Sequence, residues 1–307
     1  MHISVLLEES INSLEIKENG IYVDCTLGYA GHSSEILKRI KDGHLYAFDQ
    51  DKIAIAAAND KLKNISSNYT IIKSNFVNMK EKLNELGITE VDGILFDLGV
   101  SSPQLDCDER GFSYHKDARL DMRMDLDSNF SAWDVVNTYS EKDIARILFT
   151  YGEEKYGNSI AKNIVREREK KSIDTTFELV EIIKKSVPEK YMREKHPARR
   201  TFQAIRIEVN HELEILDKSI RDALSLLKVN GILSVITFHS LEDKIVKNIF
   251  KEKTEIDKMV KGLPNIPEEY LPDYELVNNK AIVPSDKELE ENNRSRSSKL
   301  RVIKRIK

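Results

Sequence analysis

The chain has 307 residues, enough for one large domain or two smaller ones, and its 40% hydrophobic and 33% charged residues are typical of a globular protein. Its two cysteines, Cys25 and Cys107, lie far apart without metal-type spacing, which excludes a disulfide framework, predicts no metal site and favours the reducing cytoplasm. No window approaches the roughly 18 consecutive apolar residues of a membrane span, and residues 1–4 do not resemble the start of a signal peptide.

Positive charge gathers near the C-terminal end of the sequence. Residues 294–307 contain seven Lys or Arg and no acid, so the net charge of −4 leaves −11 on the rest of the chain. This segregation predicts a basic surface for a polyanion on an otherwise acidic body. A solvated basic tail is the alternative interpretation.

The N-terminal third of the chain alternates short apolar runs with helical patterns. Strands are expected over 20–27, 44–48, 69–72 and 91–96, and helices over 33–41, 51–62 and 77–86. Short connections between alternating strands and helices are typical of a doubly wound parallel sheet. The predicted fold class is therefore α/β.

The alternation then stops, and for about a hundred residues only helical signals follow. Capping residues are expected at Ser131 and Ser140, and a capping pattern that starts at Ser240 opens a later helix. Helices are expected over 157–171, 176–187, 201–228 and 240–253, and strands over 231–237, 274–277 and 298–302. We therefore predict a discontinuous sheet domain, 1–106 with 212–307, and an inserted helical subdomain over 107–211.

The turn after the first strand favours a particular kind of ligand. It opens a helix, whose N-terminus offers N–H groups and a positive dipole end, but its two glycines, Gly28 and Gly31, do not make the G-x-G-x-x-G of a dinucleotide site. Asp49 ends the second strand, where it could accept hydrogen bonds from a ribose. Phe76 follows the third strand and could lie against an adenine, although a core phenylalanine is as good an interpretation. The pattern favours S-adenosylmethionine over a nucleotide or no ligand.

The strand over 91–96 is almost wholly apolar, and Asp97 follows directly. Ligands of open parallel sheets bind outside the carboxyl ends of the strands. Gly99 and the small hydroxyl side chains of Ser101 and Ser102 leave room for one. The alternative is that Asp97 only caps a turn.

Six separated segments resemble the RsmH (MraW) family. They are 97–106 (DLGVSSPQLD), 110–113 (RGFS), 120–125 (LDMRMD), 200–206 (RTFQAIR), 237–243 (TFHSLED) and 294–301 (RSRSSKLR). The resemblance spans essentially the whole chain. It implies a Rossmann-like S-adenosylmethionine-dependent methyltransferase with an inserted all-helical subdomain for RNA recognition. The implied reaction is methylation of the exocyclic N(4) amine of a decoding-centre cytidine in bacterial 16S rRNA of the small ribosomal subunit.

The resemblance also assigns residues to the site. The implied S-adenosyl-L-methionine contacts are Ala30, Gly31, His32, Asp49, Phe76, Asp97 and Gln104, and the first loop departs from the family pattern at Cys25, Leu27, Tyr29 and Ala30. Asp97 is the first candidate for orienting the amine or the cofactor. Ser101, Ser102 and His239 are secondary candidates for holding the cytosine, and His239 is equally well explained as a structural histidine.

Several further expectations are left for the structure. Asp121 and Arg123 either act at the site or tie the insert to the sheet, and the basic runs 190–206 and 294–307 are expected to bind rRNA phosphates. A methyltransferase acting on DNA or a small molecule is one alternative function, and a non-catalytic rRNA-binding assembly factor is another. No membrane partner is expected, and the oligomeric state is left open, with a dimer among the options.

Overall fold

The structure is a computed structural model that describes residues 4–100, 108–194, 196–256, 260 and 264–307. Its contacts divide the chain into two units. The first unit combines Met1–Gly99 with Leu213–Lys307, and the second is Val100–Glu212. None of the helices in the described part of the chain is long and apolar enough to cross a membrane.

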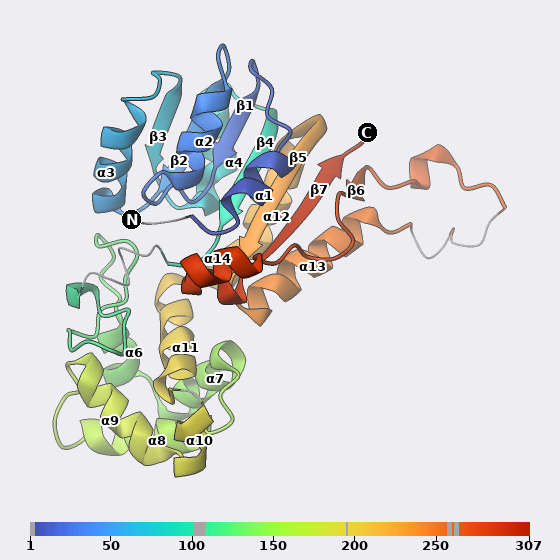
Figure 1. The fold of residues 1–307 in the computed structure, drawn as a ribbon. Coiled ribbons are helices and arrows are strands. Elements are labelled where there is room, and N and C mark those ends of the chain that lie inside the picture. The colour runs from blue at the N-terminus through green and yellow to red at the C-terminus, as the bar shows by residue number, and fades with distance from the viewer. Residues whose placement is uncertain (1–3, 101–107, 195, 257–259, 261–263) are drawn as a thin grey trace. The chain divides into compact units, whose positions relative to one another are not determined.

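The first unit is built on one mixed sheet (Figure 1). Its strands are β1 Ile21–Asp24, β2 His44–Asp49, β3 Tyr69–Lys73, β4 Val91–Asp97, β5 Leu227–Thr237, β6 Tyr274–Leu276 and β7 Lys299–Arg305. Among the described residues their order is β3-β2-β1-β4-β5-β7-β6. The strands from β3 to β5 pair in parallel, whereas β7 runs antiparallel to both β5 and β6. The predicted α/β fold class is confirmed.

Helices cover both faces of this sheet because side chains on successive strand residues point to opposite faces. On β4, Leu95 belongs to one buried cluster, and Ile94 and Phe96 belong to another. The first cluster includes residues of α1 Leu7–Ser13, α2 Gly31–Arg39 and α3 Lys52–Leu62, and the second includes residues of α4 Met79–Glu85, α12 Glu212–Leu226 and α13 Ser240–Thr254. This layering accounts for the nearly continuous apolar runs of the central strands.

The second unit is helical and has its own buried core. Its helices are α6 Ala132–Thr138, α7 Glu141–Gly152, α8 Gly157–Arg168, α9 Thr176–Ser186, α10 Glu189–Glu194 and α11 Ala198–Asn210. Both predicted caps are confirmed: Ser131 forms a capping box with Asp134, and the Ser140 hydroxyl accepts the Asp143 N–H. Between its loops, the described part of this unit has an isolated antiparallel β-bridge, which joins Arg119 to Thr175.

The single long helix predicted over 201–228 is wrong. The chain forms α11 and α12 instead, separated at His211, whose φ is 52°. Asn210 explains the break, because its side-chain amide donates to the carbonyl of Met122 and accepts from the N–H of Met124, each at 2.8 Å. These bonds tie the end of α11 to a distant loop, which periodicity cannot reveal.

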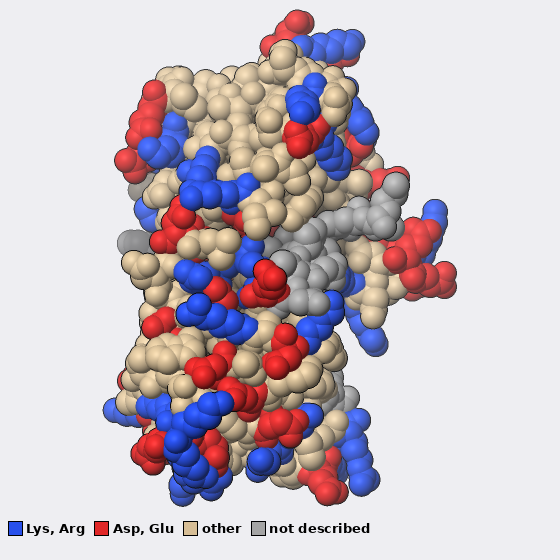
Figure 2. Space-filling model, turned by 90° about the vertical axis from the view of Figure 1, so that its left-hand side faces the viewer, with Lys and Arg blue, Asp and Glu red and all other residues tan. Residues whose placement is uncertain are grey.

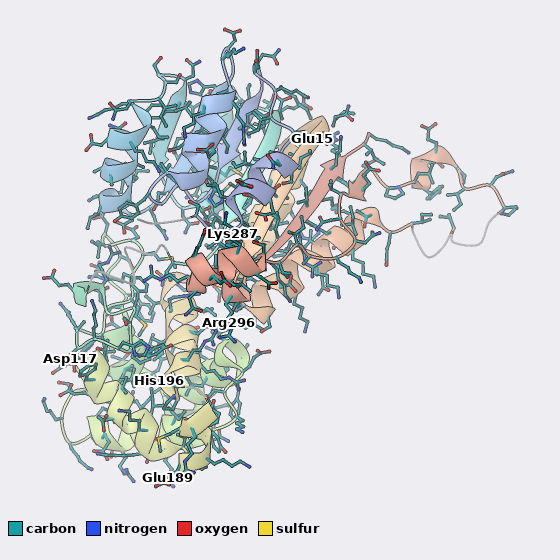
Figure 3. All side chains as sticks on the ribbon, viewed as in Figure 1. Glu15, Asp117, Glu189, His196, Lys287 and Arg296 are labelled. Carbon is teal, nitrogen blue, oxygen red and sulfur yellow. The ribbon has the colours of Figure 1, made fainter. Side chains whose placement is uncertain are left out.

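The C-terminal basic run is a strand and not a free tail. Within it, β7 lies between β5 and β6, and Leu300, Val302 and Ile303 are buried. The interpretation of 294–307 as a solvated tail is therefore wrong. Three further helices of the described chain went unpredicted: α1, α10, and α14 at Asp286–Glu291, which carries Lys287 (Figure 3).

Candidate active site

The exits of β1, β2 and β4 bring three carboxylates to one edge of the sheet, because these strands are parallel and adjacent. They belong to Asp24, Asp49 and Asp97. Thr26 ties two of the exits together: its hydroxyl accepts the N–H of Asp97 at 2.7 Å and donates to Asp24 at 3.5 Å. The rim that the sequence predicts as the ligand site therefore exists as a connected framework.

Asp24 has a structural role at this rim. It is buried, and it accepts hydrogen bonds from the Ser33 hydroxyl at 2.7 Å and the Thr26 N–H at 3.0 Å. Burial raises the pKa of its carboxyl above the ordinary value, against the lowering effect of these bonds. Because Ser33 lies in the first turn of α2, the Asp24 side chain fixes that turn against the end of β1.

The loop between β1 and α2 has a strained backbone and close packing. Gly28 and Ala30 both adopt left-handed conformations, with φ of 48° and 56°. A Cβ on Gly31 would lie 1.7 Å from the Ser4 hydroxyl oxygen, so any larger residue there would require the Ser4 side chain to move. Of the departures from the family pattern, Cys25, Leu27 and Ala30 are buried. These departures alter the packing beneath the loop more than the surface that it offers.

Asp49 connects this loop to the end of β2. Its two carboxylate oxygens accept the N–H groups of Gly28 and Asp51, each at 2.8 Å. Burial raises the pKa of the Asp49 carboxyl to about 6, against the lowering effect of these N–H groups. Each oxygen keeps a lone-pair direction for a further donor such as a hydroxyl group.

Phe76 follows β3 in the short 3-10 helix Phe76–Asn78. Its ring packs edge-to-face on Phe96, with centroids 5.4 Å apart and planes at 82°, and it is half-buried against the core of the sheet. Asn75 caps the turn by accepting the Val77 N–H and donating to Gln50. The ring is therefore held rigidly next to the exit of β3.

Asp97 is the carboxylate of the rim that has an oxygen available to a ligand. Its Oδ1 atom is buried and has no hydrogen-bond partner among the described residues. Its Oδ2 atom lies 3.6 Å from Nδ1 of His32, a buried residue of the first turn of α2. Burial, with the nearby acids Asp24 and Glu242, raises the pKa of the Asp97 carboxyl well above its ordinary value. A buried acceptor without a donor indicates a place for a ligand.

His239 has structural partners. It is the N-cap of α13, and its Nδ1 accepts the N–H of Glu242 at 3.4 Å. Glu242 is buried, and its carboxylate accepts the N–H groups of Phe238 at 2.8 Å and of His239 at 3.3 Å. The expected cap at Ser240 is wrong by one residue, because the imidazole accepts the bond that we assigned to the hydroxyl. This geometry favours the structural interpretation of His239.

The other predicted site residues are placed as follows. Ser101, Ser102 and Gln104 lie outside the described residues. Asp121 and Arg123 form a two-pronged ion pair at 2.7 Å, and Arg123 also donates to the Ser128 carbonyl at 2.5 Å. These contacts brace the loop over 121–128.

Many of the basic side chains expected to bind rRNA are already paired. In the run 190–206, Arg206 forms two 2.8 Å bonds with Glu212, and Arg200 donates to the Glu153 carbonyl. In β7, Arg301 and Lys299 both contact Asp243, at 2.7 and 3.1 Å. Lys and Arg are mixed with Asp and Glu on the face shown in Figure 2. Because part of each run is paired in this way, neither run as a whole forms the predicted basic surface.

Some basic side chains of these runs remain on the surface. Lys190 and Arg199 are exposed in the second unit, and Arg296 is exposed in the short 3-10 helix before β7 (Figure 3). These positions are better candidates for phosphate contacts than the paired ones, because they form no ion pair with another residue that the structure describes.

Comparison with known proteins supports the resemblance seen in the sequence. The family described as the MraW methylase family matches residues 1–306. The ribosomal RNA small subunit methyltransferase H of Exiguobacterium sibiricum is 56% identical over 307 residues, covering 100% of this chain and 98% of that one. Among solved structures, an rRNA methylase from Streptococcus thermophilus (11% identity, TM-score 0.45) covers 100% of both chains. TrmN from Thermus thermophilus (10% identity, TM-score 0.43) covers 98% of this chain and 48% of that one.

The family match and the 56% identity both extend over essentially the full length, including the strand exits and the helical insert. On this basis the chain is a methyltransferase and belongs to the MraW methylase family.

Proposed function

We propose that this methyltransferase transfers a methyl group from S-adenosyl-L-methionine to the exocyclic N(4) amine of a decoding-centre cytidine in 16S rRNA of the small ribosomal subunit. The observation that carries the proposal is the Oδ1 atom of Asp97 at the exit of β4, which is buried and has no hydrogen-bond partner in the described part of the chain. The relative at 56% identity, named a ribosomal RNA small subunit methyltransferase, supports the choice of substrate.

The residues of the rim fit the proposed cofactor. Asp49 holds its carboxylate oxygens in place with backbone N–H groups and has capacity left for ribose hydroxyls. Phe76 presents a fixed ring for the adenine, and the first turn of α2, with Ala30, Gly31 and His32, lies at the positive end of the helix dipole, where a carboxylate is favoured. When bound, S-adenosylmethionine supplies a methyl group on a positively charged sulfur. Gln104 stays a proposed cofactor contact.

Asp97 has the chemistry that a cytosine amine needs. The amine is a weak nucleophile because its lone pair is delocalised into the ring, so the enzyme must orient it and accept a proton as the new bond forms. The free Oδ1 can accept a hydrogen bond from an amine N–H and thereby orient the amine. Ser101 and Ser102 follow on the same segment and are proposed to hold the cytosine ring. The base must be flipped out of the folded RNA, at a cost of a few kcal/mol.

The helical insert is proposed to recognise the RNA. We assign this role to 107–211, in the second unit, on which Lys190 and Arg199 are exposed. Phosphate contacts of this kind position an RNA without reading its bases. A ribosomal substrate also places the protein in the cytoplasm.

Methyl transfer to small ribosomal subunits tests this function directly. Subunits from cells that lack the chain are incubated with the protein and radiolabelled donor, and the labelled nucleoside is identified after digestion. We expect N(4)-methylcytidine from the 16S rRNA and none from duplex DNA. Label in DNA or in a small molecule would favour a methyltransferase on another substrate.

A titration with S-adenosylmethionine separates catalysis from simple binding. The proposed enzyme binds the donor, and Asp49→Asn weakens that binding because the amide is a poorer acceptor for hydroxyl groups than the carboxylate. A chain that binds 16S rRNA but shows no affinity for the donor would instead be a non-catalytic assembly factor.

A further inference from the structure

His32 has one ring nitrogen committed to the backbone. The side chain is buried, and Nε2 lies 3.2 Å from the carbonyl oxygen of Val5. A carbonyl oxygen can only accept, so Nε2 must carry the hydrogen of this bond. The other nitrogen, Nδ1, therefore has a lone pair when the ring is neutral, and it faces Oδ2 of Asp97 at 3.6 Å.

This arrangement joins an acid to a base at the rim. At 3.6 Å the two atoms are slightly beyond hydrogen-bond distance, and such contacts commonly tighten when a substrate binds. The other charged groups that act on Asp97 are the acids Asp24, at the end of β1, and Glu242, on α13. Both disfavour the ionised carboxylate, and they raise the pKa of Asp97 in addition to the effect of burial. The protonated carboxyl that these effects favour can donate its proton from Oδ2 to Nδ1 of His32.

We propose that His32 is a positioning residue that acts through Asp97, so that the two side chains together hold the proton that the substrate amine loses. The inference rests on the proposed function and extends it to the fate of that proton. In the reaction the N–C bond forms, the S–C bond of the donor breaks and the sulfur becomes neutral. The amine gives up one proton to Oδ1 of Asp97 while the proton on Oδ2 passes to Nδ1 of His32, so that the carboxyl stays neutral and the imidazole gains the positive charge that the sulfur loses.

A purely structural role would not require Nδ1 to face the carboxylate. The first turn of α2 is already held by the bond from Ser33 to Asp24 and by the packing of Gly31 on Ser4. The bond from Nε2 to Val5 adds a third attachment, and it also fixes the tautomer. Such a bond, which decides which nitrogen carries the hydrogen and which keeps the lone pair, is the usual means of preparing a histidine for proton transfer.

Substitution of His32 can test the roles of its two ring nitrogens separately. His32→Gln can keep a donor near the Val5 carbonyl but has no titratable group for Asp97. A matched control is His44→Gln, because the Nε2 of His44 also makes a side-chain bond, to Thr70 at 2.9 Å, but at the start of β2 and thus at the opposite edge of the sheet. Single-turnover methyl transfer to small subunits is measured from pH 5.5 to 9 with saturating RNA and donor.

We expect His32→Gln, measured at saturating donor, to lower the rate about tenfold or more and to change the shape of its pH profile. His44→Gln should leave the rate and the profile as they are. A His32→Gln profile parallel to that of the original chain would reduce His32 to a structural residue and overturn the inference. If the original chain itself transfers no methyl group to 16S rRNA, the proposed function fails instead.

A second measurement does not depend on the folding of His32→Gln. In protein labelled with nitrogen-15 histidine, the His32 signals should show Nε2 protonated and Nδ1 titrating across the pH range. Asp97→Asn should alter the titration of Nδ1 and leave the His44 signals unchanged. A protonated Nδ1 with a bare Nε2, or a His32 titration that ignores Asp97→Asn, would contradict the proposal.

Discussion

At the scale of single residues, the three carboxylates of the rim differ because their surroundings differ. Asp24 accepts hydrogen bonds from Ser33 and Thr26, and Asp49 accepts hydrogen bonds from two backbone N–H groups. Asp97 has one carboxylate oxygen without a partner among the described residues. The sequence could place all three at strand ends from apolar periodicity. It could not rank them, because their roles depend on donors that come from other elements.

Asp97→Asn should abolish most of the activity without weakening the fold. The amide is nearly the same size but cannot take a proton, so we expect the single-turnover rate to fall about 100-fold or more. Because burial and neighbouring acids disfavour the Asp97 carboxylate, its removal should leave the free energy of unfolding at pH 8 unchanged or higher. Rates and urea denaturation measure the two effects.

Asp92→Asn is the control for that substitution. Asp92 lies near the start of β4, at the other edge of the sheet, where it pairs with Lys17 and Lys228. Its removal should reduce stability and leave the rate of the folded enzyme unchanged. An Asp97→Asn enzyme that is as fast as the original would remove Asp97 from the chemistry.

The affinity for S-adenosylmethionine should depend on pH through Asp49. Its pKa is raised to about 6 in the fold, so the carboxyl is largely neutral at pH 5 and ionised at pH 7. An ionised carboxylate is the stronger acceptor for ribose hydroxyls, and the Kd of the donor should therefore fall as the pH rises through 6. In Asp49→Asn the binding should be about tenfold weaker, and this dependence should be absent.

The same shift has a consequence for stability. A carboxyl whose pKa is raised from 3.8 to about 6 in the fold contributes stability that is fully present below pH 3.8 and is lost as the pH rises through 6. Asp49→Asn should therefore gain stability relative to the original chain between pH 4 and pH 7. Denaturation of both proteins across this window provides the measurement, and curves that stay parallel would show that Asp49 titrates normally.

At the scale of secondary structure, the helix starts show what a sequence can and cannot predict. Ser131 and Ser140 cap helices as predicted, because hydroxyl groups at these positions are common caps. The cap of α13 is a histidine, which propensity does not suggest. The break at His211 and the pairing of β7 on both sides were also missed. Both depend on contacts with segments far away in the sequence.

His239→Ala should act on stability more than on chemistry. It removes the acceptor that caps α13, which we expect to cost about 1–2 kcal/mol of unfolding free energy. His239→Asn, whose side chain can still cap, should recover part of that loss. The rate per folded molecule should fall less than tenfold in both variants, measured at a temperature where they remain folded. A loss of about 100-fold at full folding would instead make His239 part of the chemistry.

At the scale of the whole molecule, a local excess of Lys and Arg did not predict a free basic surface. The positive charges of β7 are largely paired with acids of other elements: Arg301 and Lys299 with Asp243, and Lys304 with Glu15. Counting charges along a sequence cannot detect this, because the acids come from other elements. The family could be predicted from the sequence, since six ordered segments resemble it. The roles of the individual residues within each segment could not be predicted.

RNA affinity should therefore depend on the exposed cations of the second unit. Replacing both Lys190 and Arg199 with alanine should weaken binding to 16S rRNA and reduce the slope of log K against log salt by roughly 1.5, as expected for two lost phosphate contacts. Donor affinity should not change. Lys304→Ala, which removes a paired charge of β7, is the control and should leave the slope unchanged. Equal losses in the two proteins would contradict this assignment.

The most direct test of the central claim is a crystal structure of the protein with a non-reactive analogue of the donor and cytidine. We predict that the exocyclic amine of the cytosine lies about 3 Å from Oδ1 of Asp97, in line with the methyl position of the donor. An amine bound elsewhere, with Oδ1 of Asp97 still without a partner or occupied by the donor alone, would contradict the account.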